Sequence, residues 1–257
     1  MKIFKAHYID DKHDMCIDIL NTGTNTLLFT IDEIEFSATS FGYFELSNSS
    51  DYEKAKGKFE FLKAGGYSSL LKSSMEYTYF LQRYKLTIEI PVVITKTEND
   101  INSDIEAMLN VEYKLIKHDE NKPTSSWNCD DKKMYTDDCL VLRFSLSVED
   151  FEYNIKENKN CLDFEVLLLE LIRKTGDKYK LKCCFTCQYS DYSPYGCDGF
   201  GTMECYRKHK EEYLKVNDKP SYFEYLEGLS CEMMQETFLC DKFEQRTKCK
   251  GYRGFVI

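Results

Sequence analysis

The chain has 257 residues, of which 42% are hydrophobic and 14% aromatic, and it carries a formal net charge of −10 at pH 7. This apolar content is enough to build a real core, which excludes global disorder. The negative charge would repel a phosphate backbone and therefore disfavours general nucleic-acid binding.

The first eleven residues, MKIFKAHYIDD, have charges that interrupt every apolar stretch, so they lack the apolar centre of a signal peptide. No run of about 18 apolar residues follows, which argues against a membrane-spanning helix. We therefore expect a cytoplasmic protein without membrane contact. In that compartment its 12 cysteines are expected to be reduced thiols or metal ligands rather than disulfides.

Apolar and polar residues alternate with a period of two along the first half of the chain, which indicates half-buried antiparallel strands. Pro91 lies inside one of these runs and suggests an edge strand or a bulge there. We expect an antiparallel β-sandwich-like N-terminal half, forming a domain over residues 1–158. The expected strands are 2–9, 15–20, 27–36, 86–94, 105–115 and 140–148.

The pattern changes after the polar residues 156–160, because apolar residues then recur at helical spacing from Phe164 to Leu171. Asp163 can cap this helix, and Gly176 can end it. We expect a small cysteine-rich α+β domain over residues 159–257, which makes the whole chain an α+β protein. Its further expected elements are a strand at 179–185, a helix from 203 or 204 to 216, a helix from 220 to 228 and a strand at 233–239.

Five cysteines lie between Lys182 and His209, and two of them, Cys184 and Cys187, form a C-x-x-C pair. Such a pair can offer two thiolates to a tetrahedral zinc ion, at sulfur–zinc distances of about 2.3 Å. Cys205, at an expected helix start, and Cys240, after an expected strand, are the best-placed partners. The predicted ligands of one structural zinc ion are Cys184, Cys187, Cys205 and Cys240.

Two other interpretations of these cysteines remain open. On a strand, Cys183 would face the core with Leu181 and Phe185, and the remaining thiols could likewise be buried without a metal. A redox C-x-x-C is disfavoured, because such a pair normally opens a helix. The residues that follow here, SDYSPYG, instead predict a loop.

This loop, Ser190–Gly196, holds two tyrosines, a carboxylate and a proline that presets a turn. Rigid tyrosines provide contact surface at a low entropic cost. We therefore predict Asp191, Tyr192 and Tyr195 as partner-binding residues, with a lid over the metal site as the alternative.

The cysteine-rich segment resembles an uncharacterised bacterial family, one of the domains of unknown function. The shared patterns are C-F-x-C-x-x-S-D-Y-S-P-Y-G, F-G-x-x-x-C-[FY]-R and Q-E-T-[FY]-L-C, which match Cys184–Gly196, Phe200–Arg207 and the stretch ending at Cys240. The resemblance places recurring cysteines at the same four positions as the predicted zinc ligands. It implies no activity, and its members look like immunity or accessory proteins of bacterial conflict systems.

Three functional hypotheses follow. The first is a non-enzymatic protein of the immunity, anti-toxin or accessory type, whose acidic surface binds a basic protein partner. The second is a metal- or thiol-dependent enzyme that uses Cys205, His209 and Asp191. The third is a structural domain without metal. An open coordination position, or a nucleophile within hydrogen-bond reach of a base, would favour the enzyme.

Overall fold

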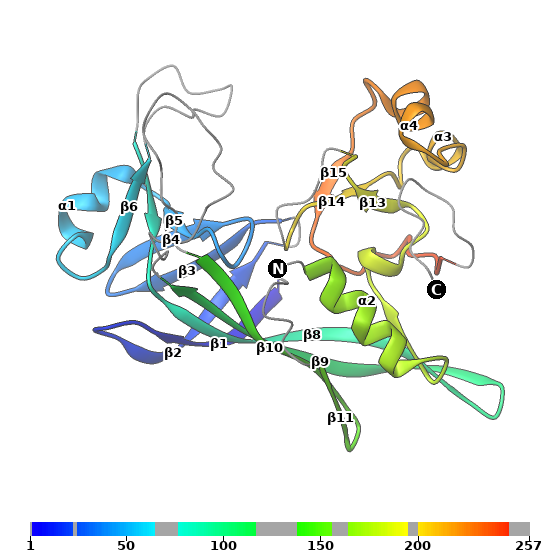
Figure 1. The fold of residues 1–257 in the computed structure, drawn as a ribbon, viewed down its shortest axis with the longest axis horizontal. Helices are drawn as coiled ribbons and strands as arrows, with labels where there is room; N and C mark the ends of the chain where they lie inside the picture. Colours follow the sequence, from blue (N-terminus) through cyan, green and yellow to red (C-terminus); the bar gives the residue numbers. More distant parts are fainter. Residues whose placement is uncertain are drawn as a thin grey trace.

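The computed structural model describes residues 2–22, 25–64, 77–116, 138–155, 164–194 and 200–246. In these residues the protein is mostly antiparallel β-structure with few helices, and its main sheet curls into a half-barrel (Figure 1). The sheet has twelve strands, in the order β11-β10-β9-β8-β1-β2-β3-β4-β5-β7-β6, with β12 paired to β8. Its strands are β1 (Lys2–Ile9), β2 (Asp14–Asn21), β3 (Leu27–Ile31), β4 (Ile34–Ala38), β5 (Glu45–Leu46), β6 (Phe61–Ala64), β7 (Thr78–Leu81), β8 (Lys85–Glu98), β9 (Ile101–Ile116), β10 (Asp138–Val148), β11 (Phe151–Ile155) and β12 (Tyr179–Lys182).

The strands predicted from period-two alternation are confirmed, with β8 and β9 longer than expected. These two pair in register from Lys85 with Lys114 to Glu98 with Ile101. The predicted strand 27–36 is a hairpin, broken at Asp32 and Glu33, which both have positive φ. Since all strands before residue 117 belong to one curled sheet, the sandwich-like arrangement is not confirmed.

Pro91 lies in an interior strand rather than at the edge of the sheet. One side of β8 pairs with β9 throughout, whereas the other side pairs with β1 at Lys85–Glu89 and with β12 at Val93–Lys96. Pro91 falls between these two partners. Its missing amide hydrogen is tolerated best where a neighbouring strand is absent.

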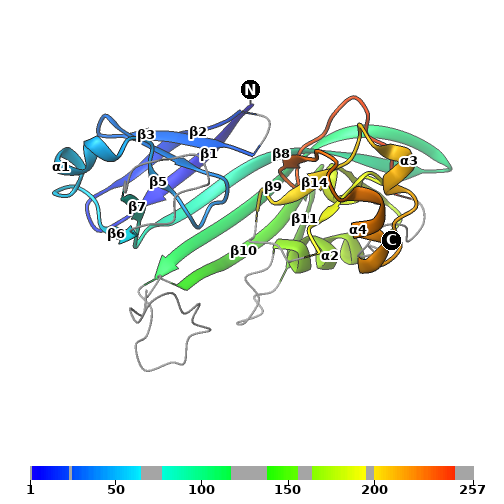
Figure 2. The ribbon, with the colours of Figure 1, turned by 90° about the horizontal axis from the view of Figure 1, so that it is seen from above.

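The chain beyond residue 163 adds four helical segments and a second, three-stranded sheet. These are α2 (Phe164–Thr175), the 3-10 turn η2 (Cys184–Thr186), α3 (Lys210–Tyr213), α4 (Lys219–Leu226), and β13 (Ser190–Tyr192), β14 (Met203–Cys205) and β15 (Glu232–Met234). A 3-10 turn η1 (Ser49–Asp51) and α1 (Tyr52–Ala55) lie earlier, between β5 and β6. Figure 2 shows the second sheet and α2 to α4 at one end of the long β8–β9 hairpin.

Several expected elements of this part are wrong. The predicted helix 203–216 is replaced by strand β14 and the short helix α3, and the predicted strand 233–239 is limited to β15. The predicted strand 179–185 ends at Lys182, because residues 184–186 turn as η2. The helices predicted at 164–171 and 220–228 are confirmed as α2 and α4.

One hydrophobic core runs through both parts of the chain. Phe200 stacks on Phe41 with ring centroids 4.5 Å apart, and Phe164 meets Phe144 at 5.2 Å and Phe200 at 5.0 Å. The same cluster includes strand residues such as Leu109. The predicted boundary near residue 158 lies outside the described residues, but the core on either side of it is shared. None of the described helices is long and apolar enough to cross a membrane.

Candidate metal centre

The four cysteines predicted as zinc ligands lie on three segments that are bonded together through their backbones. Cys184 begins η2, and Cys187 follows it, with the Cys187 amide donating to the Cys184 carbonyl at 3.1 Å. The Cys184 amide donates to the Phe238 carbonyl at 2.7 Å, which fixes the segment leading to Cys240. Cys205 ends β14, where it pairs with Ser190 on β13, three residues after Cys187.

These thiols also influence one another electrostatically. Burial raises the pKa of Cys184, and the charges of the neighbouring thiols, Cys205, Cys183, Cys187 and Cys240, raise it further. Burial likewise raises the pKa of Cys205, again with contributions from Cys187 and Cys240. The structure therefore brings the four cysteines into one region. Within the described ranges, however, no group of three or more His, Cys, Asp or Glu side chains has an arrangement that could hold a metal ion.

Arg207 supplies an observation that bears on whether zinc would fit. Its guanidinium pairs with Glu232 and, although burial acts to lower its pKa, lies close enough to Cys205 and Cys240 for their charges to raise it. Its Nη1 atom is buried, and among the residues that the structure describes it has no hydrogen-bond partner. Thiolates that bind a metal are strong hydrogen-bond acceptors, and a four-thiolate zinc centre carries excess negative charge. The chemistry of four sulfurs beside a guanidinium suits zinc, although the described side chains are not arranged as a metal site.

The structure contradicts the assignment of Asp191 and Tyr192 to a partner-binding surface, because these residues are only 1% and 0% exposed. Asp191 Oδ2 accepts from the Tyr213 hydroxyl at 3.0 Å, and the Tyr192 hydroxyl donates to Glu236 Oε1 at 3.2 Å. The tyrosine and carboxylate form internal bonds here rather than a contact surface. Tyr195, the third predicted residue, lies outside the described residues.

Arg246 is buried beside Asp191, and no pattern in the sequence predicted this pair. Its side chain is 1% exposed and lies 3.9 Å from Asp191. The guanidinium donates to the carbonyls of Cys187, at 3.1 Å, and Ser190. Its backbone amide donates to the Thr186 carbonyl at 2.9 Å. The segment around Arg246 therefore closes over the C-x-x-C turn.

Glu236 is a second buried carboxyl, with no exposed surface. Burial raises its pKa to about 7, although hydrogen bonds act in the opposite direction. The amides of Gly201, at 2.7 Å, and Thr202, at 3.5 Å, donate to it, together with the Tyr192 hydroxyl. Through these hydrogen bonds Glu236, which follows β15, connects the end of that strand to the residues just before β14.

Cys205 and His209 do not share the helix predicted from 203 or 204 to 216. Cys205 lies on a strand, and His209 precedes the first residue of α3. Asp191, the third residue of the enzymatic alternative, is held by Tyr213 and Arg246. The arrangement therefore gives no support to a catalytic group of Cys205, His209 and Asp191.

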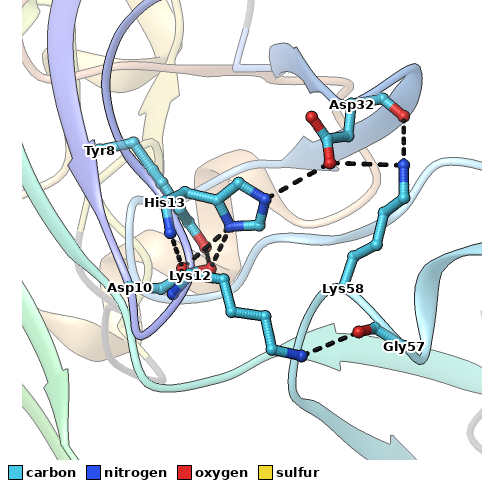
Figure 3. A network of polar contacts seen from close by, with 7 residues as sticks. All are labelled: Tyr8, Asp10, Lys12, His13, Asp32, Gly57 and Lys58. Atoms are coloured by element: carbon cyan, nitrogen blue, oxygen red, sulfur yellow. Dashed lines mark hydrogen bonds and ion pairs between the residues drawn. The ribbon is translucent and has the colours of Figure 1, made fainter.

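A separate polar network surrounds His13 at the other end of the molecule (Figure 3). Its Nδ1 lies 2.9 Å from Asp10, which also accepts from the Tyr8 hydroxyl at 2.8 Å, and its Nε2 lies 3.5 Å from Asp32. The imidazole stacks on Phe59 with centroids 4.8 Å apart. The network ties the β1–β2 and β3–β4 turns to the start of β6. The Asp-x-x-His spacing in the first turn was its only signal in the sequence.

Comparison with known proteins gives one match. The model of a family described as "Family of unknown function (DUF6304)" matches residues 2–190, which run from β1 to the start of β13. No curated protein and no solved structure matches the chain. The resemblance to a family without an assigned function is therefore confirmed.

Proposed function

The chain belongs to this family of unknown function, and we propose that it is a non-catalytic protein-binding protein stabilised by one structural zinc ion. In this proposal the strand-rich N-terminal half carries the binding surface, and the small cysteine-rich α+β half holds the metal. Its partner is a basic protein, as for an immunity, anti-toxin or accessory protein in the cytoplasm of a bacterium.

The observation that carries the zinc proposal is the gathering of four thiols, three of them buried, beside the Arg207 guanidinium. Zinc with four protein sulfur ligands has no open position for substrate, so such a centre stabilises the fold rather than performing catalysis. The ligands would be Cys184, Cys187, Cys205 and Cys240, and Arg207 would donate to their sulfurs. The ion would cross-link the η2 turn, β14 and the segment after β15.

The binding proposal rests on two exposed hairpin ends. Ile101, at the β8–β9 end, is 70% exposed, and Phe151, at the β10–β11 end, is 52% exposed. Acidic residues flank both, with Asp100 beside Ile101 and Asp150 beside Phe151. The Phe151 ring already has Lys178 Nζ 4.7 Å from its centroid, so the Ile101 end is the better candidate. An apolar side chain beside a carboxylate suits a partner that brings arginine or lysine to a hydrophobic contact. In Figure 1 the β8–β9 end projects beyond the body of the protein.

Protein purified without added metal is expected to contain one zinc ion per chain, measured by elemental analysis. Cys187→Ser should lose this zinc, because a tetrahedral site that lacks one ligand binds far more weakly. Cys183→Ser is the matched control, since Cys183 is a buried neighbour outside the proposed ligand set. A zinc-free wild-type protein, or equal zinc content in the two variants, would contradict the proposed centre.

A basic protein is expected to co-purify with the tagged chain from its native cells in a stoichiometric complex. Ile101→Glu should abolish this complex, because it places a charge in the apolar contact. Ile3→Glu is the control, since Ile3 is also exposed, at 47%, but lies on β1. The measurement is quantitative mass spectrometry at two salt concentrations, and higher salt should weaken binding. Retention of the same partner by both variants would refute binding through this hairpin end.

A further inference from the structure

The outer face of strands β1, β2 and β8 has a hollow of about 490 Å³ that no part of the proposed function uses. Two rows of side chains line it across the three strands. Cys16, His7 and Thr87 form one row, and Asp18, Lys5 and Glu89 form the other. This face therefore gathers a thiol, an imidazole, an ammonium group and two carboxylates.

Cys16 and His7 are directly opposite each other in the antiparallel β1–β2 pair. Residues in such positions point to the same face and have Cβ atoms about 4.5–5.5 Å apart. Cys16 is an exposed free thiol, whereas the other free cysteines whose side chains the structure describes are buried or partly buried. A thiol on an open face can be reached by reagents that buried thiols exclude.

His7 is oriented by a carboxylate. Its Nε2 lies 2.6 Å from Asp14 Oδ1, and Asp14 is on β2, two residues before Cys16. Because an ionised carboxylate only accepts hydrogen bonds, Nε2 carries the hydrogen that faces Asp14, and in the neutral ring Nδ1 is then the nitrogen that can accept a proton. A nucleophile, a base and a group that orients the base are the elements of an activated thiol.

The surrounding charges indicate what kind of molecule this face would accept. Asp18 and Glu89 line the hollow, and Asp14 lies beside it as the partner of His7, whereas Lys5 is the ammonium among the lining residues and lies 2.7 Å from Asp18. The face therefore has an excess of negative charge, which favours a ligand with an amine over one with a carboxylate.

We propose that Cys16 is a site of thiol–disulfide exchange with small disulfides that carry amino groups, and that His7 is its base. His7 Nδ1 takes the proton from the Cys16 thiol, and Sγ attacks one sulfur of the disulfide. A new S–S bond to Cys16 forms as the original S–S bond breaks, and its electrons leave with the second sulfur. The departing thiolate receives the proton from His7. Cys16 is thereby oxidised to a mixed disulfide, and half of the reagent is reduced to a thiol.

The test uses the whole protein and two reagents: cystamine, which carries two amines and no carboxylate, and oxidised glutathione, whose four carboxylates outnumber its two amines. Peptide mass spectrometry follows the rate at which each cysteine is modified. We expect Cys16 to react before all other cysteines, and to react faster with cystamine than with oxidised glutathione. His7→Ala should slow the reaction at least about tenfold, and added imidazole should restore part of the rate.

His209→Ala is the control for loss of a histidine elsewhere, and it should leave the rate unchanged. The His7 side chain is 43% exposed, so its loss should also leave the thermal unfolding temperature unchanged. Three results would each overturn the assignment: an unaltered rate in His7→Ala, no rescue by imidazole, or equal rates with the two disulfides. None of these results depends on whether the protein contains zinc or binds a partner.

Discussion

Replacement of Gly201 by alanine is expected to lower the free energy of unfolding by about 3–5 kcal/mol. Gly201 has a φ of +89°, and an added Cβ would lie 2.2 Å from the backbone carbonyl oxygen of Thr39. A backbone atom of a β-sheet protein cannot move aside as a flexible side chain can. The Gly201 amide also donates to the buried Glu236, so any displacement weakens a bond that the carboxyl needs.

Gly228→Ala separates the two causes of this loss. Gly228 also has positive φ, at +81°, but no atom lies within 4 Å of its added Cβ. Gly228→Ala should therefore lower the free energy of unfolding by only the strain of a non-glycine residue at positive φ, about 1–2 kcal/mol. Urea denaturation of both variants measures the difference. Equal losses would mean that the contact between Gly201 and Thr39 does not contribute to stability.

Replacement of Arg246 by methionine is expected to cost about 3–5 kcal/mol, because it removes one partner of a buried ion pair. Asp191 would keep the Tyr213 hydroxyl but lose the cation, and the carbonyls of Cys187 and Ser190 would lose their side-chain donor. Methionine preserves much of the buried volume, so the loss reports mainly the polar interactions.

Two further variants test this explanation by urea denaturation. Adding Asp191→Asn to Arg246→Met should recover part of the lost stability, since a neutral amide is less costly to bury than a carboxylate. Lys210→Met breaks an exposed ion pair with Glu244, at 2.7 Å, and should cost under about 1 kcal/mol. A loss in Arg246→Met as small as that in Lys210→Met would show that the buried pair is not important for stability.

The longer strands and two of the helices could be predicted from the sequence because their signals are local. Period-two alternation identified β8, β9 and β10, and α2 has apolar residues at helical spacing. The start of α4 is also local, because Asp218 caps it through the Ser221 amide at 2.8 Å.

The elements that could not be predicted depend on distant partners. The stretch after Met203 has the composition of a helix, but β14 pairs on both sides with β13 and β15, and the Tyr206 amide donates to Tyr189 at 2.8 Å. Such tertiary pairing overrides weak helical propensity. The burial of Asp191 also could not be predicted locally, because its partner cation, Arg246, lies 55 residues later in the chain. The C-x-x-C spacing is local and relates Cys184 to Cys187, whereas Cys205 and Cys240 lie far along the chain, and their role as zinc ligands stays a prediction.

The position of Arg246 has a consequence for how the protein matures during synthesis. Its guanidinium and amide complete the bonding of residues 186–190, so these earlier residues cannot reach their final state until residue 246 has left the ribosome. Domains generally fold during translation as soon as their parts are available. The strands β1 to β10 can therefore assemble on the nascent chain, while the C-x-x-C turn remains accessible to ions and chaperones. Premature termination shortly before residue 246 would leave a nearly complete sheet with an open cysteine turn, which is a form that quality-control proteases can recognise.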